Sequence, residues 1–309
     1  MKYVGLDTQI RRNNSRSIVL LMMFPLLILA GVFGFFLWVE QGDLDAAAYE
    51  FIVTIPFVLG GVAIWFLIAF SGHSAMINLS TGSETLDRKE NMRVYNLTEN
   101  LCISVGMTMP KLRIIESDQL NAFASGINEK TYTVTLTRGI IEKLDDRELE
   151  GVIAHELMHI RNRDVRLLIV SIIFVGIFSF VVSVLFRSLL YGGARRRNNK
   201  DGGGQLLIIA LVIALVVYFL SILFRFALSR KREYMADAGA ADMTRNPMAL
   251  ASALRKISGN SDVDVRSDDV KQMFIDNGPK EGEAGLSGLT GLFATHPPIM
   301  KRVQFLENM

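Results

Sequence analysis

Cysteine is almost absent from this chain: Cys102 is the single one in 309 residues. One thiol excludes an internal disulfide framework and a zinc site built from cysteines. A strong charge of one sign is lacking too, since 33 Lys and Arg face 31 Asp and Glu and the net charge is +2. That charge is too small to indicate a nucleic-acid partner.

Charged residues are also missing from four long apolar stretches, in a chain that is 50% hydrophobic. The stretches are residues 18–39, 51–71, 167–186 and 206–224. At 1.5 Å per helical residue each spans roughly 30 Å, the thickness of the hydrocarbon core of a bilayer. The first has no small-residue cleavage site behind it, so it is expected to be a retained anchor. The sequence therefore predicts a multi-pass membrane protein; for the second pair a buried helical hairpin in a soluble core remains the alternative.

Basic residues before the first stretch set the expected orientation. Residues 1–17 carry Lys2, Arg11, Arg12 and Arg16, whereas the loop after the first stretch is acidic. The positive-inside bias then predicts a cytoplasmic N-terminus and a transmembrane hairpin over 18–71. The loop between the third and fourth stretches is basic, with Arg195–Arg197. Either this loop is carried across the membrane, or the second pair does not fully span it.

These boundaries divide the rest of the chain into three parts. Residues 72–166 and 229–309 are predicted to form a catalytic part on the cytoplasmic side, and residues 167–228 the second hydrophobic pair between them. The expected fold is mainly α: multi-pass membrane helices plus a zincin-like α+β catalytic domain with a small sheet.

Two of the four His residues in the chain fall within one five-residue pattern, His155-Glu156-Leu157-Met158-His159. On a helix His155 and His159 lie on one face, about a turn apart, and can bind the same ion. Glu156 between them is placed to accept a proton from the attacking water. This is the H-E-x-x-H arrangement, which indicates a zinc site with its own general base. An amphipathic helix with incidental histidines is the plainer alternative.

A third zinc ligand is needed, because a catalytic zinc site usually has three protein ligands and an open position. Glu233, the first acidic residue after the fourth apolar stretch, is the candidate. Asp237 follows one helical turn later, where it can accept a hydrogen bond from a ligand histidine and fix the orientation of its ring.

A small sheet is expected just before the motif, from residues 111–115, 121–126 and 132–137. If one edge is open, Asn121, Ala122, Phe123 and Ala124 could hold an extended polypeptide by backbone hydrogen bonds. An ordinary hairpin packed on the helix is the equal alternative.

Taken together, these segments resemble the HtpX-type membrane zinc metalloproteases, gluzincins related to the CAAX prenyl endopeptidases. The matching segments run in that family's order from residue 85 to the C-terminus: residues 121–126, the 155–159 motif, Asn162 with Asp164, residues 232–237, and His296-Pro297-Pro298. Arg163 departs from the pattern, since it stands where such proteins often have Gly.

The resemblance implies one Zn²⁺ per chain held by His155, His159 and Glu233, with Glu156 as catalytic acid and base. Asn162 and Asp164 are expected beside Asp237 behind the ligands, and His296 is a candidate for stabilising the oxyanion. It further implies an inner-membrane protease with a cytoplasmic-facing site that acts on misfolded or damaged membrane proteins.

Two rival functions remain. A dedicated enzyme that processes a prenylated or signal-type peptide would cleave few substrates, not many unrelated ones. A non-catalytic membrane scaffold or transporter would bind no stoichiometric zinc, and the absence of charge from the apolar stretches disfavours a transport path.

Overall fold

The computed structural model describes residues 6–192, 203–227, 230–258, 260–265, 270, 273–276 and 297–309. The chain divides into two compact units. Unit 1 consists of Met1–Ser15, Gly72–Ile169 and Phe226–Met309, and unit 2 of Arg16–Ser71 and Val170–Arg225.

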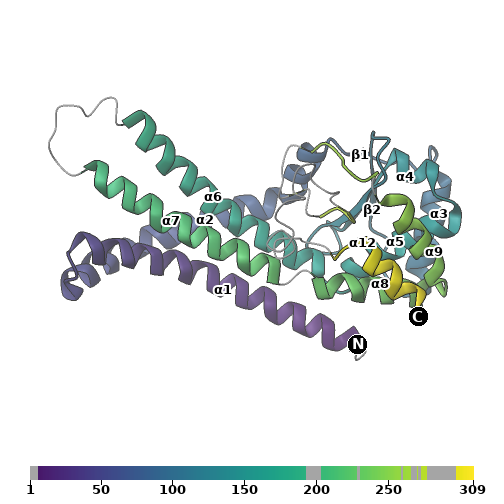
Figure 1. Cartoon of the computed structure of the whole chain (residues 1–309), viewed down its shortest axis with the longest axis horizontal. Helices are drawn as coiled ribbons and strands as arrows, with labels where there is room; N and C mark the ends of the chain where they lie inside the picture. The colour runs from purple at the N-terminus through teal and green to yellow at the C-terminus, as the bar shows by residue number, and fades with distance from the viewer. Residues whose placement is uncertain are drawn as a thin grey trace. The chain divides into compact units, whose positions relative to one another are not determined.

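Long helices supply unit 2 (Figure 1): α1 (Leu6–Val39), α2 (Leu44–Thr81), α6 (Asp164–Gly192) and α7 (Gly203–Ala227). Among the described residues, three stretches are long and apolar enough to cross a membrane: Met22–Val39, Leu44–Thr81 and Asp164–Leu190. The fourth predicted stretch contributes a shorter apolar segment, Leu207–Leu220 of α7. Helix α1 begins well before residue 18, so the basic segment ahead of the first apolar stretch continues the same helix.

Aromatic side chains pack inside unit 2, and other apolar side chains cover its outside. Phe24 is 0% exposed and stacks on Phe174 with ring centroids 4.6 Å apart. By contrast, Phe57 on α2 and Phe219 on α7 are 78% and 52% exposed. A soluble protein rarely exposes so much contiguous apolar surface, whereas lipid solvates it. The exposure of α7 side chains therefore disfavours the buried-hairpin alternative for the second pair.

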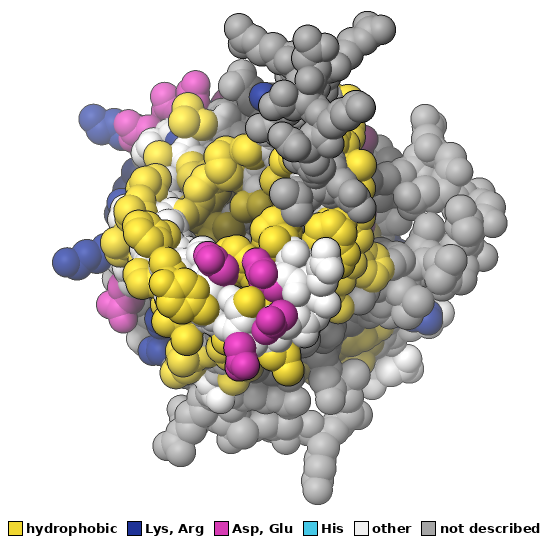
Figure 2. Space-filling view, turned by 90° about the vertical axis from the view of Figure 1, so that its left-hand side faces the viewer, with side chains coloured by type: hydrophobic (Ala, Val, Ile, Leu, Met, Phe, Trp, Pro, Cys, Tyr) yellow, Lys and Arg dark blue, Asp and Glu magenta, His cyan; other side chains and the backbone are white. Residues whose placement is uncertain are grey.

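The turn between α1 and α2 is acidic, as the sequence analysis found. Figure 2 shows this end of unit 2, where Asp and Glu side chains gather among hydrophobic ones. Asp43 and Asp45 are exposed, and Asp43 accepts hydrogen bonds from the backbone N–H groups of Asp45 and Ala46 at the start of α2. The charged turn marks the limit of the apolar surface.

Unit 1 contains a four-stranded sheet with strand order β1-β2-β4-β3. The strands are β1 (Glu84–Thr85), β2 (Lys111–Ile115), β3 (Ala122–Ser125) and β4 (Thr133–Thr137). β1 pairs with β2 and β3 with β4 in antiparallel orientation, while β2 and β4 are parallel. The predicted small sheet is thus present, and β3 is its outer strand next to β4.

The helices of unit 1 surround one central helix, α5 (Asp146–Arg161), which carries the His-Glu motif. The others are α3 (Met92–Ser104), α4 (Arg138–Lys143), α8 (Arg230–Thr244), α9 (Pro247–Ile257) and α12 (Ile299–Glu307). Helix α5 begins with a capping box: Asp145 accepts from the N–H of Glu148, and the Glu148 carboxylate accepts from the N–H of Asp145. The carboxylate of Glu148 also accepts from Ser252 and Lys256 of α9, so the cap ties α5 to a neighbouring helix.

Helices α5 and α9 approach each other closely at Gly151. A Cβ at this position would lie 3.2 Å from the Leu250 backbone. A side chain here would require Leu250, which is 0% exposed, to shift by a few tenths of an ångström. The part of α5 that precedes His155 is therefore buried and packed closely against α9.

Candidate metal centre

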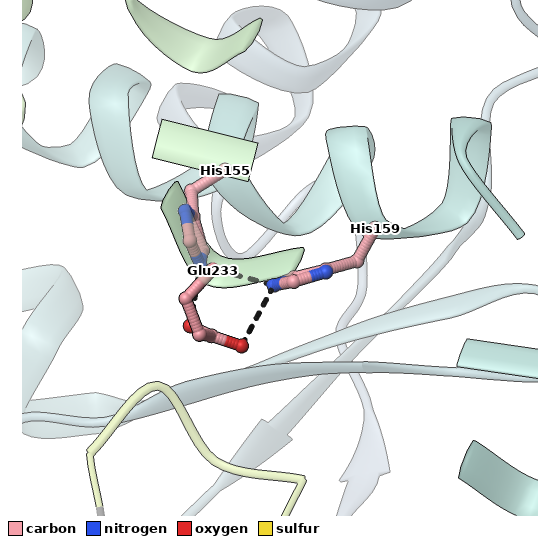
Figure 3. A group of neighbouring side chains, drawn as sticks. All are labelled: His155, His159 and Glu233. Carbon is pink, nitrogen blue, oxygen red and sulfur yellow. Dashed lines mark hydrogen bonds and ion pairs between the residues drawn. The ribbon is translucent and has the colours of Figure 1, made fainter. Parts of the chain in front are cut away.

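His155 and His159 occupy the same face of α5, as the four-residue spacing requires. Their Nε2 atoms lie 3.1 Å apart, with the ring planes at 90° to one another. His155 is 0% exposed, while His159 is partly exposed. Two imidazole nitrogens thus converge on one point (Figure 3).

Glu233 reaches the same point from the first turn of α8. Its Oε2 lies 3.7 Å from His155 Nε2, and its Oε1 lies 3.6 Å from His159 Nε2. One ligand atom of each of the three residues lies within 4.8 Å of the others. Residues 155 and 233 are far apart in the sequence, so the fold itself assembles this cluster.

The three donors fit a zinc ion. Ligand atoms at about 2.0–2.1 Å around a tetrahedral ion are separated by about 3.3 Å. Here the two Nε2 atoms are 3.1 Å apart, Glu233 Oε1 lies 3.6 Å from His159 Nε2, and the other oxygen, Oε2, lies 3.7 Å from His155 Nε2. Two imidazoles with one carboxylate are a set that zinc uses in catalytic sites. The residues present therefore fit the metal that the motif predicts.

Each of the two imidazoles has a carboxylate next to its Nδ1 atom. Nδ1 of His155 is 3.0 Å from Asp237 Oδ1, and Nδ1 of His159 is 3.2 Å from Asp164 Oδ2. Each Nδ1–H donates to its carboxylate, so Nε2 is the nitrogen of each ring that can bind a metal. In His155 this Nε2 also lies 3.2 Å from Nη2 of Arg302. Asp237 and Asp164 thus have the contacts expected of residues that orient the ligands.

Arg302 of α12 is a member of the site that the sequence analysis did not assign. It is 0% exposed and donates from Nε and Nη2 to the two oxygens of Asp237, at 2.9 and 2.7 Å. Its Nη1 lies 3.4 Å from Glu233 Oε2 and donates to the Ile275 carbonyl at 3.1 Å. The only sequence signal for Arg302 is its place shortly after the His-Pro-Pro segment.

The charges around Asp237 favour its ionised form. Burial raises the pKa of the Asp237 carboxyl, but Arg302 and His155 outweigh burial and hold that pKa below its ordinary value. For His155, burial and Arg302 lower the pKa, whereas hydrogen bonds to Asp237 and Glu233 raise it more, to about 9. Asp237 is therefore a strong acceptor for the His155 ring.

Glu156 follows His155 on α5 and is 2% exposed. Burial raises the pKa of its carboxyl, and the charges of His155 and His159 act in the opposite direction. A carboxyl with a raised pKa beside two ligand residues is suited to take up and return a proton.

Two other predicted residues have different positions. Asn162 is buried at the C-cap of α5, where its N–H bonds to the carbonyls of Met158 and Ile160. Asn162 therefore lies at the C-terminal end of α5, the helix that carries His155 and His159. His296 lies outside the described residues; Pro298, just after it, caps the start of α12.

The predicted substrate segment forms the start of the outer strand β3. Asn121, Ala122, Phe123 and Ala124 are all buried, and the Asn121 side chain donates to the carbonyls of Ser261 and Asp276. The Ala122 carbonyl accepts from the N–H of Ile275. The outer edge of β3 is thus covered by a short chain segment at Ala122, and Ile275 also contacts Arg302.

Removal of the Arg302 guanidinium is expected to destabilise unit 1. Arg302→Ala leaves the Asp237 carboxylate buried without its main cationic partner, which costs about 3–5 kcal/mol of unfolding free energy. Thermal unfolding of the purified chain in detergent measures the effect, with the exposed neighbour Lys301→Ala as control. Equal melting temperatures for the two variants would contradict this assignment.

Comparison with known proteins places this arrangement in a family. Residues 88–309 match the model of peptidase family M48. A protease HtpX homolog from Bacteroides fragilis is 56% identical, with 100% of both chains covered. The homologs from Dictyoglomus thermophilum and Listeria monocytogenes are 36% and 33% identical, and each covers 97% of this chain and 93% or more of its own. The crystal structure of S. mikatae Ste24p matches 96% of this chain and 66% of its own, with 17% identity and a TM-score of 0.45.

Proposed function

Because this chain belongs to peptidase family M48 and is a membrane metalloprotease, we propose that it is a zinc endopeptidase whose metal is held by His155, His159 and Glu233. The observation that carries the proposal is the convergence of these three donors, with each imidazole held by a carboxylate through Nδ1. Bound zinc would acidify a water molecule and polarise the substrate carbonyl.

Other residues of the chain transfer the proton and orient the metal ligands. Glu156 accepts the proton of the attacking water and later delivers it to the leaving amine. Asp237 and Asp164 keep the Nε2 lone pairs of His155 and His159 directed at the metal. Arg302 fixes Asp237, and through it the His155 ring. His296 remains our candidate for stabilising the oxyanion.

We place the substrate backbone along the outer edge of β3. Asn121 and Thr137 exchange a hydrogen bond toward β4, so Ala122 and Ala124 direct their backbone groups to the opposite side. At Ala122 this side is taken by Ile275, whose carbonyl accepts from Arg302, and Arg302 in turn contacts His155. Ala124 is the next position at which an extended peptide can pair, with little demand on its side chains.

Loss of the outward N–H at residue 124 is expected to weaken substrate binding. Ala124→Pro removes that donor without removing a hydrogen bond to β4, and kcat/KM should fall about 3–10-fold, the contribution of one hydrogen bond. The metal content should not change. Ala124→Ser, which keeps the N–H, is the control; a proline variant that cleaves as fast as the serine variant would exclude this edge.

Quality control of damaged or misfolded membrane proteins is the role we propose, because backbone pairing selects unfolded chains more than particular sequences. The test is cleavage of a panel of unrelated unfolded proteins and destabilised membrane proteins by the purified, zinc-loaded chain. Cleavage across the panel supports this role. Cleavage of a single prenylated or signal-type peptide would replace it with dedicated processing.

We further propose that residues 72–166 and 229–309 act together as a catalytic part on the cytoplasmic side of the cell membrane. The basic residues ahead of the first apolar stretch and the acidic α1–α2 turn support this orientation. A single cysteine introduced at Asp43, in a Cys102→Ser background, should react with an impermeant thiol reagent added outside intact cells. A cysteine introduced at exposed Lys301 should not react until the cells are opened.

A further inference from the structure

A polar pocket of about 730 Å³ lies in unit 1 where α5 ends and α6 begins. One wall is the loop after α3, the second is the turn between β3 and β4, and the third is the junction of the two helices. The chemistry-bearing residues that line it are Glu129, Lys130, Tyr132, Arg161, Arg163 and Arg166. Neither the metal site nor the proposed substrate edge uses these side chains.

The pocket carries an excess of positive charge. Four of its lining residues are basic and Glu129 is the single acid among them. Arg161, Arg163 and Arg166 are each partly buried, and neither Arg161 nor Arg166 forms an ion pair with any described residue. Like charges that line one pocket repel, so a bound anion would stabilise this arrangement.

The phenol of Tyr132 lines the same pocket as Arg163 and Arg166. Burial raises the pKa of Tyr132, while Arg163 and Arg166 act to lower it. The phenol hydroxyl can donate to the same anion that the guanidinium groups bind. A phosphate group accepts several such hydrogen bonds at once, and arginine matches its geometry.

The backbone of Arg163 is in the left-handed region, with φ of 60°. Glycine adopts this conformation at little cost, whereas an arginine there is strained. The chain nevertheless places a long cationic side chain at this one-residue joint between α5 and α6. Strain retained at such a position points to a function of the side chain.

The position along the chain indicates which anion. Arg166 belongs to the first turn of α6, whose segment Asp164–Leu190 is long and apolar enough to cross a membrane. Residues at the start of a membrane helix lie at the level of the lipid headgroups, and basic residues there attract anionic lipids.

We propose that this pocket binds the phosphate of an anionic phospholipid headgroup, with Arg161, Arg163, Arg166 and Lys130 as its cationic ligands and Tyr132 as a further donor. The site is independent of the metal and of peptide cleavage. A bound lipid would brace the junction at which the ligand helix α5 passes into the membrane helix α6.

Native mass spectrometry of the full chain in a non-ionic detergent tests the proposal. Phosphatidylglycerol and phosphatidylcholine of the same acyl chains are added separately, and the apparent Kd of the first retained lipid is measured. The wild-type chain should retain phosphatidylglycerol at least tenfold more tightly. Arg161→Gln with Arg166→Gln should weaken that binding roughly twenty-five-fold, about fivefold for each basic residue. Lys301→Gln, which removes one exposed charge elsewhere in unit 1, should bind as the wild type does.

Arg163→Gly separates binding from folding. It removes a ligand and also the backbone strain, so phosphatidylglycerol binding should fall while thermal stability in lipid-free detergent does not. Glycerol phosphate in the same experiment distinguishes the source of the anion: displacement of the lipid at equal concentration would assign the pocket to a soluble phosphate. Equal retention of the two lipids, or unchanged retention in the double arginine variant, would overturn the proposal.

Discussion

Glu156→Gln abolishes peptide cleavage and leaves zinc in place. The substitution keeps the size of the side chain but removes the carboxylate that accepts the proton, and positioned acid–base groups of this kind contribute about 10²–10⁴-fold to the rate. Glu156 is buried in α5 beside the two proposed histidine ligands, and it is not one of the three residues whose donor atoms converge. We therefore expect this variant to lose turnover and to keep the metal content of the wild type.

The measurement is cleavage of an unfolded protein, with zinc per chain determined on the same sample. Glu150→Gln is the matched control, because it makes the same change on the same helix at a partly exposed position away from the cluster. Cleavage by the Glu156 variant at more than about a tenth of the wild-type rate would exclude Glu156 as the general base.

Glu233→Gln should lose the metal and, with it, cleavage. The carboxylate supplies the one anionic donor of the three, with its oxygens 3.6 and 3.7 Å from the two Nε2 atoms. Loss of residues that merely orient ligands typically weakens metal binding 10–100-fold, so loss of a ligand is expected to cost more than about 100-fold. Competition with a chelator of known affinity measures the change.

Asp242→Asn serves as the control for Glu233→Gln. Asp242 lies on the same helix, α8, is exposed, and pairs with exposed Arg245 on the surface. It should bind zinc and cleave as the wild type does. Zinc affinity within a few-fold of wild type in the Glu233 variant would mean that another residue completes the site.

The sequence predicted the parts of the site that depend on local spacing. His155 and His159 are four residues apart, and the structure has both on one helix, α5, with their Nε2 atoms 3.1 Å apart. Glu233 with Asp237 follows the same helical rule on α8, and both carboxylates lie beside His155.

The sequence did not predict contacts that depend on how distant segments meet. Arg302 contacts His155 across 147 positions, and no periodicity in α12 distinguishes a buried arginine from a surface one. Ile275 pairs with the outer edge of β3 at Ala122 across more than 150 positions, and Ile275 is not part of a strand. Arg163 was visible as an unusual residue at a helix junction, but its left-handed backbone conformation and its place in a basic pocket required the structure.

A zinc titration tests the central claim, that His155, His159 and Glu233 hold one catalytic zinc ion. The purified chain is stripped with a chelator, zinc is added back in steps, and cleavage of an unfolded protein is followed at each step. The account predicts no cleavage without metal and a rate that rises to a plateau near one zinc per chain. Cleavage that persists in the stripped chain, or zinc that binds without restoring it, would contradict the account.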